Sequence, residues 1–258
     1  MDMHDSVIKA RPANVSVEEW QARLQLAACY RLFDHLGWTE MIFNHITLRV
    51  PGPQPLFLIN PYGLHYSEVT ATNLVKIDLE GNKVDGSPHP INPAGFVIHA
   101  AIHRARPDAH CVIHTHTTAG VAVACKQAGL SFENFYGAQM YGRIAYHDFE
   151  GVTTDIDEQQ RLVASFGDKE VLILRNHGLL VVGPDVPSAY YLMWSLQRAC
   201  EVQLASAAIP GPNWPVRESV LQRIPQQRKA MKASTTPTGQ LVFEGICRRA
   251  GIRYEDLI

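Results

Sequence analysis

Two short, uninterrupted apolar runs, each ending in histidine, constrain the fold of this chain more than any other feature. CVIHTH covers residues 111–116, and EVLILRNHG covers residues 170–178. Apolar runs of this length, without polar residues at alternate positions, are typical of strands that are buried on both faces. The chain must therefore place helices on both sides of a sheet, which is an α/β architecture.

Segments with helical periodicity surround these strands. Ser16 and Glu19 form a capping-box pattern at the start of a helix that runs to Gly37. Asn92 is the expected N-cap of a second helix, which ends near residue 107. The remaining predicted elements are helices over 117–127, 155–166, 186–208 and 238–250, and a hairpin of strands 45–50 and 56–59.

Composition indicates one globular unit with a small-molecule partner. The 258 residues are 46% hydrophobic and 19% charged, with a formal net charge of -2, so the chain can bury a sizeable core and is not basic enough to indicate nucleic-acid binding. No segment approaches the roughly 18 consecutive apolar residues that span a bilayer, and no signal peptide is recognisable. We therefore expect a cytoplasmic protein that binds neither nucleic acid nor membrane.

Three segments are distinguished by their patterning. Residues 1–15 have no periodic apolar pattern and are expected to form an arm, while residues 16–210 form the domain. Residues 211–258 are expected to form a helical tail that packs on the domain or on a neighbouring subunit. The five cysteines contain no CxxC pair, so reduced, buried thiols are expected.

Histidines are the residues most suited to chemistry in this sequence. His114 and His116 are two positions apart on a predicted strand and point to the same face, and His177 ends another apolar strand. Two interpretations fit: chance placement among twelve histidines, or a metal site with one position open for substrate or water. His99 and His103, four apart on one helix face, are more typical of core or metal-supporting histidines than of ligands.

Five segments taken together resemble the class II aldolase and adducin family. They are FNHITLRV at 43–50, LINPYGLHYSEV at 58–69, INPAGFVIHAAIHRARPDAHCVIHTHT at 91–117, YGRIAYHDFEG at 141–151 and ILRNHGLLVVG at 173–183. The resemblance implies a three-layer α/β/α fold with a central, mainly antiparallel sheet, assembled as a homotetramer. Because the matching histidines bind zinc in catalytic members, it also implies that His114, His116 and His177 bind Zn²⁺ or another divalent transition metal.

The sequence departs from the catalytic members of that family at three places. Gly95 stands where they have an acidic general acid/base. Pro93 and Ala94 replace small hydroxyl residues that bind phosphate, and Asn44-His45 replaces a phosphate-binding glycine-asparagine pair. The resemblance is thus closer to the adducin-like branch, and a phosphorylated sugar is not the expected substrate.

Two functions remain open from the sequence. The first is a metal-dependent lyase that performs aldol cleavage or decarboxylation of a small hydroxy or keto compound. Decarboxylation needs no initial proton abstraction, so it tolerates the loss of the acidic residue better than aldol cleavage does. The second is a non-catalytic, adducin-like assembly or scaffold module, which explains Gly95 without new chemistry but not three convergent imidazoles.

Further candidate residues follow from the resemblance and from residue chemistry. Tyr136 lies near the position of a tyrosine that some aldolases use, and Tyr141 and His147 are further candidate proton donors, although each residue type is more common in cores and interfaces. The candidates for substrate binding are Asn44, His45, Gly63 and Asn92. Gly63 also fits a turn glycine, and Asn92 also fits a helix cap with no further role.

Overall fold

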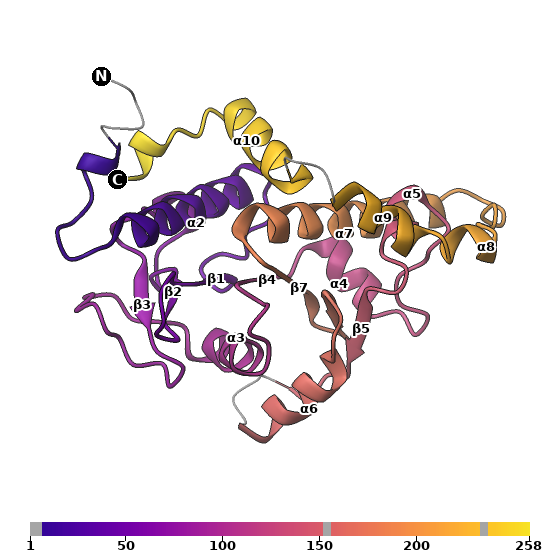
Figure 1. Ribbon diagram of the computed structural model, residues 1–258. Coiled ribbons are helices and arrows are strands. Elements are labelled where there is room, and N and C mark those ends of the chain that lie inside the picture. Colours follow the sequence, from indigo (N-terminus) through magenta and orange to yellow (C-terminus); the bar gives the residue numbers. More distant parts are fainter. Residues whose placement is uncertain (1–6, 152–155, 233–236) are drawn as a thin grey trace.

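The computed structural model describes residues 7–151, 156–232 and 237–258, which form a sheet between two layers of helices (Figure 1). The seven strands have the order β3-β2-β1-β4-β7-β6-β5, and neighbouring strands are antiparallel except for the parallel pair β5 and β6. Their bounds are β1 His45–Arg49, β2 Phe57–Ile59, β3 Val75–Ile77, β4 Cys111–Thr115, β5 Ile144–His147, β6 Val171–Leu174 and β7 Gly178–Gly183. The predicted α/β fold with a mainly antiparallel sheet is confirmed.

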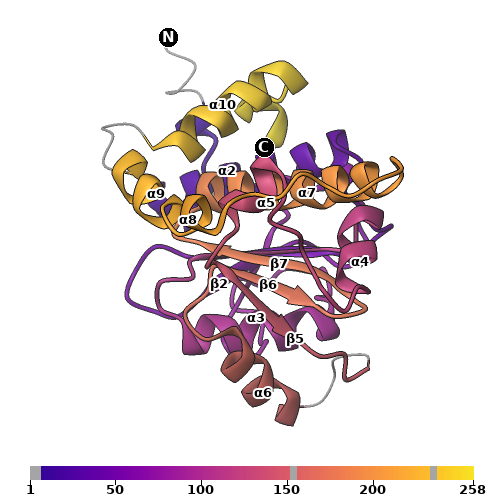
Figure 2. The same cartoon turned by 90° about the vertical axis from the view of Figure 1, so that its right-hand side faces the viewer.

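Each face of the sheet is covered by its own pair of long helices (Figure 2). Helices α2 (Val17–His35) and α7 (Val186–Ala207) lie on one face, and α3 (Pro93–Ala105) and α6 (Ile156–Phe166) on the other. Along β4, Cys111 and Ile113 belong to the core under α2 and α7, whereas Val112 belongs to the core under α3 and α6. This two-sided burial explains why β4 is apolar at every position before its histidine.

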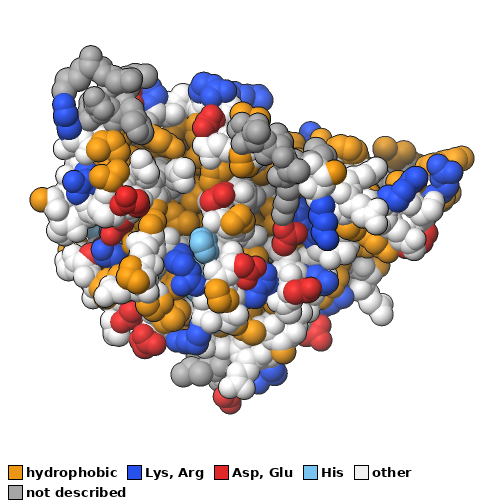
Figure 3. All heavy atoms as spheres, in the orientation of Figure 1, with side chains coloured by type: hydrophobic (Ala, Val, Ile, Leu, Met, Phe, Trp, Pro, Cys, Tyr) orange, Lys and Arg blue, Asp and Glu red, His pale blue; other side chains and the backbone are white. Residues whose placement is uncertain are grey.

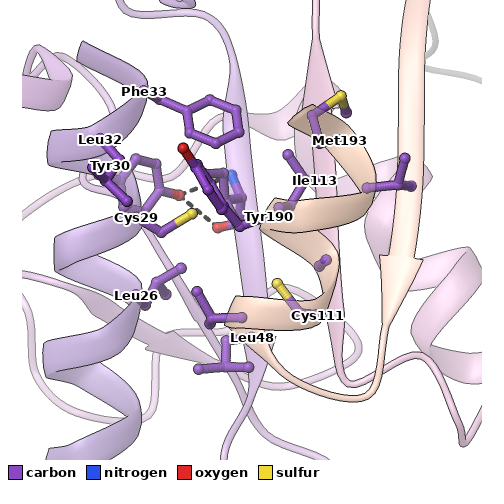
Figure 4. Close-up of a cluster of buried hydrophobic side chains, with 14 of the residues drawn as sticks. Leu26, Cys29, Tyr30, Leu32, Phe33, Leu48, Cys111, Ile113, Tyr190 and Met193 are labelled. Carbon is purple, nitrogen blue, oxygen red and sulfur yellow. Dashed lines mark hydrogen bonds between the residues drawn. The ribbon is translucent and has the colours of Figure 1, made fainter. Parts of the chain in front are cut away.

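Helix α2 is fixed by both its cap and its core face. The Ser16 hydroxyl accepts a hydrogen bond from the Glu19 backbone, as predicted, while the Glu19 carboxylate forms 2.9 Å ion pairs with Arg23 and Lys76. The Tyr30 hydroxyl lies in the core between α2 and the sheet and contacts backbone atoms of Ile46 (Figure 4). Polar contacts therefore set how α2 docks on the sheet.

The first and last described segments of the chain pack into the core that α2 and α7 share. Val7 and Val15 are buried, and the Trp20 indole donates to the Val7 carbonyl at 2.9 Å. Helix α10 (Thr238–Ala250) packs on α7 and α2, and Leu257, in the short helix η2 (Tyr254–Leu257), is buried against them. Residues 1–6 of the predicted arm, residue 155 of the predicted helix and residues 233–236 of the tail lie outside the described residues.

Several short elements were not predicted from the sequence. They are β3, β5, η1 (Tyr66–Glu68), α5 (Phe135–Gln139), α8 (Glu218–Leu221), α9 (Ile224–Lys232) and η2. The helix predicted at 117–127 is shorter, α4 (Thr118–Ala124), and ends at Cys125. That cysteine is exposed, so the prediction that all five thiols are buried is wrong at this position.

The surface carries charges of both signs. On the face shown in Figure 3, basic and acidic side chains alternate without a large area of either sign. Ile209 and Trp214, in the segment that follows α7, are 69% and 91% exposed. Within the described ranges, no helix is both long and apolar enough to cross a membrane.

Candidate metal centre

Three histidines from two neighbouring strands meet at one end of the sheet. His114 lies on β4, His116 follows the end of that strand, and His177 lies in the turn between β6 and β7. Because β4 pairs with β7, the three imidazoles converge, with ring centroids 4.6–4.8 Å apart in each pair. One nitrogen from each ring lies within 4.8 Å of the others. The juxtaposition predicted from the sequence is present.

The turn Asn176-His177-Gly178 makes this approach possible. Asn176 has a φ of 56°, a left-handed conformation that asparagine tolerates better than most residues. A Cβ atom on Gly178 would lie 2.4 Å from the Thr115 carbonyl oxygen and 3.1 Å from the His116 ring. Only glycine lets β7 begin this close to the histidines on β4.

The donor set fits a divalent transition metal. His114 Nδ1 donates to the Leu179 carbonyl at 2.9 Å, which leaves Nε2 as a free ligand atom, 2.7 Å from His116 Nε2. Burial lowers the pKa of all three imidazoles, that of His177 to about 4, so the rings are neutral at physiological pH. Three neutral imidazoles leave coordination positions for substrate or water, as catalytic zinc sites do.

A second group of buried histidines adjoins the first. His45 on β1 pairs with His114 across the ladder, and their ring centroids lie 5.5 Å apart. The His99 ring packs edge-on against His45 at 4.3 Å, and the Thr47 hydroxyl lies 2.7 Å from both His99 Nδ1 and His103 Nε2. His99 and His103 are thus buried on α3 behind His45, which fits either a core position or a supporting role at the centre.

His177 also borders a pocket at the end of β5. His147 and His177 line this pocket together with Phe149, Glu158 and Arg175. The Ser165 hydroxyl donates to a backbone carbonyl, so it accepts from His147 Nδ1, at 3.1 Å. On the other side of the ring, His147 Nε2 lies 3.7 Å from Glu158 Oε1. Of the three predicted proton donors, His147 is the one that the described residues place beside His177.

Comparison with known proteins agrees with this geometry. The class II aldolase and adducin N-terminal domain matches residues 24–204, most of the chain. The chain belongs to the class II aldolase and adducin family. The motifs that carried the resemblance all lie within the matched range.

Relatives of this class II aldolase and adducin chain fall into two kinds. An aldolase II superfamily protein of Pseudomonas syringae is 42% identical, with a TM-score of 0.86 over 92% of this chain and 94% of that one. L-fuculose 1-phosphate aldolase of Glaciozyma antarctica PI12 is 28% identical, with a TM-score of 0.78 over 96% and 98%. Rat α-adducin is 48% identical over 73% of this chain, which spans 26% of the adducin. Family membership therefore includes proteins named as aldolases and proteins named as adducins.

Besides His45, the sequence predicted three substrate-binding residues, and their surroundings differ. Asn44 is buried, and its Oδ1 has no hydrogen-bond partner among the described residues. The Asn92 side chain donates to the Phe43 carbonyl at 3.1 Å, which ties the start of α3 to the loop before β1. Gly63 is exposed in a turn after β2 with a φ of 101°, as expected of a turn glycine.

The two candidate tyrosines lie at the other side of α7. Tyr136, on α5, packs edge-on against Trp194 at 5.9 Å, and the Tyr141 hydroxyl is 2.7 Å from Glu218 Oε1. That hydrogen bond raises the pKa of the Tyr141 hydroxyl. In the described part of this class II aldolase-like chain, no contact joins either tyrosine to the three histidines.

Sequence reasoning overlooked two residues of the site. Thr47 is two positions after His45 on β1, so strand periodicity places both side chains on one face and could have revealed it. Phe149, 53% exposed, has its ring 6.3 Å from that of His177. No pattern in YGRIAYHDFEG distinguishes this phenylalanine from one in the core.

Proposed function

We propose that this member of the class II aldolase and adducin family is a metal-dependent lyase. Its substrate would be a small hydroxy or keto compound without a phosphate group, and its reaction carbon-carbon cleavage by decarboxylation or aldol cleavage. The observation that supports this best is the convergence of three neutral imidazoles, one of which, His177, also lines the pocket at the end of β5. An assembly module has no evident need for such a site.

The residues divide into binding and positioning roles. His114, His116 and His177 would hold Zn²⁺ or another divalent transition metal. When bound, the ion would supply a Lewis acid for negative charge that develops on a carbonyl oxygen. His147 would move a proton at the pocket beside His177, and Asn44 and His45 would contact the substrate. Decarboxylation is favoured because Gly95 supplies no base for an initial proton abstraction.

A phosphorylated substrate is disfavoured, although the Glaciozyma relative is named for one. Residues 93 and 94 carry no hydroxyl group. The pocket beside His177 is lined by Asp148, Glu150 and Glu158, which would repel a dianion. Its arginine, Arg175, donates to the carbonyls of Lys126 and Gln127 and lies over the Tyr146 ring.

The alternative function is a non-catalytic assembly or scaffold module. It is favoured by 48% identity to rat α-adducin and by the glycine at position 95. We propose a cytoplasmic homotetramer under either function. Tyr136 and Tyr141 could then take part only in the site of a neighbouring copy.

The test is a screen for decarboxylation and aldol cleavage with purified, tag-free protein. Hydroxy, keto and dihydroxy acids are incubated with protein loaded with Zn²⁺, Mn²⁺ or Co²⁺, and release of carbon dioxide or aldehyde is followed. The lyase function predicts turnover that a chelator and His177→Ala each abolish, whereas His110→Ala, an exposed histidine just before β4, leaves it intact. Metal binding without turnover on any of these acids would favour the assembly module.

A further inference from the structure

Gly95, in the first turn of α3, lies against the imidazole of His45. A Cβ atom on Gly95 would lie 2.4 Å from His45 Nδ1 and 2.5 Å from its Cε1, well inside van der Waals contact. The His45 ring thus occupies the space that a side chain at position 95 would need. Glycine at position 95 and histidine at position 45 are therefore sterically coupled, because the imidazole fits here only without a side chain at position 95.

His45 carries a buried hydrogen-bond acceptor on the same face of the sheet as the metal centre. Its Nδ1 lies 3.3 Å from the Phe43 carbonyl, which can only accept, so Nδ1 carries the proton. With the proton on Nδ1, the neutral ring has a lone pair on Nε2. That atom is buried and has no partner among the described residues. Because His45 is opposite His114 in the ladder, its side chain lies on the face that carries the metal centre.

The neighbouring ring of His99 also supplies no hydrogen-bond donor for His45 Nε2, as the chain of contacts from His103 shows. His103 Nδ1 donates to the Ala109 carbonyl at 2.9 Å, and burial lowers the pKa of His103 to about 3, so its Nε2 must accept from Thr47. The Thr47 oxygen then accepts from His99 Nδ1, which leaves His99 Nε2 as a second buried lone pair without a described partner. Buried polar atoms are rarely left unsatisfied, so a donor from a ligand fits this place.

We infer that His45 Nε2 accepts a hydrogen bond from a hydroxyl group of the substrate, and that the site recognises a 2-hydroxycarboxylate group as part of a small substrate. This inference rests on the proposed function, because it takes the three histidines as metal ligands. Neutral ligands leave the charge of a divalent ion unbalanced, and one carboxylate offsets it. A 2-keto acid carries the same carboxylate but has no hydroxyl to donate to His45.

The test uses the full, tag-free chain loaded with Co²⁺, whose visible absorption reports ligand binding without any turnover. The protein is titrated with L-lactate, D-lactate, pyruvate and acetate. The preferred lactate should bind about 3- to 10-fold more tightly than pyruvate, the effect of one neutral hydrogen bond. His45→Met should abolish this preference, while His45→Gln, a side chain of equal length with an acceptor, should retain it.

The outcomes distinguish failure of the role assigned to His45 from failure of the proposed function. Any of three results would overturn the role of His45 and leave the metal site intact. They are equal or tighter binding of pyruvate, a preference for lactate that survives His45→Met, and a preference for lactate that His45→Gln loses as fully as His45→Met does. A chain that binds no Co²⁺ at all would overturn the proposed function, and this inference with it.

Discussion

Substitution of Gly95 by alanine tests the packing at the site directly. In a helix, glycine to alanine ordinarily raises the free energy of unfolding by about 1 kcal/mol. At position 95 the new methyl group would lie 2.4–2.8 Å from three atoms of the His45 ring, which is itself packed against His99. Overpacking of this kind costs about 1–3 kcal/mol, which offsets the helix gain and leaves a net loss of up to about 2 kcal/mol.

The chain offers a matched control in α10. Gly245 is also helical, but the nearest atom to an added Cβ is Arg248 Nη2 at 3.8 Å. Gly245→Ala should therefore stabilise the protein by about 0.5–1 kcal/mol. In a His45→Ala background the penalty at position 95 should disappear, because the obstructing ring is gone.

Urea unfolding of the four variants and the parent, followed by tryptophan fluorescence at one pH, gives the free energies. The variants are Gly95→Ala, Gly245→Ala, His45→Ala and the double variant at positions 45 and 95. A Gly95→Ala protein as stable as Gly245→Ala, or additive effects in the double variant, would refute the steric coupling.

Two further predictions concern the buried polar groups. Burial lowers the pKa of His45 and His177 to about 4 and of His103 to about 3. As the pH falls, these histidines therefore bind protons in the unfolded chain before they do so in the folded one. The free energy of unfolding, measured in the presence of a chelator, should be highest above pH 6.5 and fall toward pH 4 by about 1.4 kcal/mol per pH unit for each histidine. A free energy that does not change with pH would contradict this. The Tyr30 hydroxyl accepts from the backbone of Ile46 and Asn60, at 2.8 and 3.2 Å, so Tyr30→Phe should cost about 1–3 kcal/mol in urea unfolding. Tyr66→Phe, whose buried hydroxyl has no described partner, should cost far less, and equal losses would refute the argument.

The parts of the fold that the sequence revealed are those with strong local signals. Ser16 and the pattern after it located α2, and the apolar runs before His114 and His177 located β4 and β6. Strands β3 and β5 are no shorter than β2 and β6 but lack a continuous apolar run, because β3 contains a lysine and β5 is only half-buried over most of its length. Their positions depend on partners that are distant in the sequence.

The candidate site shows the same division. Same-face spacing and the strand ends predicted the meeting of His114, His116 and His177. No local pattern predicted that His45 fills the space above Gly95, because that contact joins β1 to α3 across fifty residues of chain. The positions of Tyr136 and Tyr141 beyond α7 depend likewise on tertiary packing rather than on their motifs.

Metal content tests the central claim most directly. Plasma mass spectrometry of the tag-free protein, purified without chelator, should give about one transition-metal ion per chain, as a single three-histidine site requires. His114→Ala/His116→Ala should lose the ion, while His35→Ala/His110→Ala, which removes two exposed histidines, should keep it. Absence of metal from the parent protein, or equal metal in the two double variants, would contradict a metal site at His114, His116 and His177.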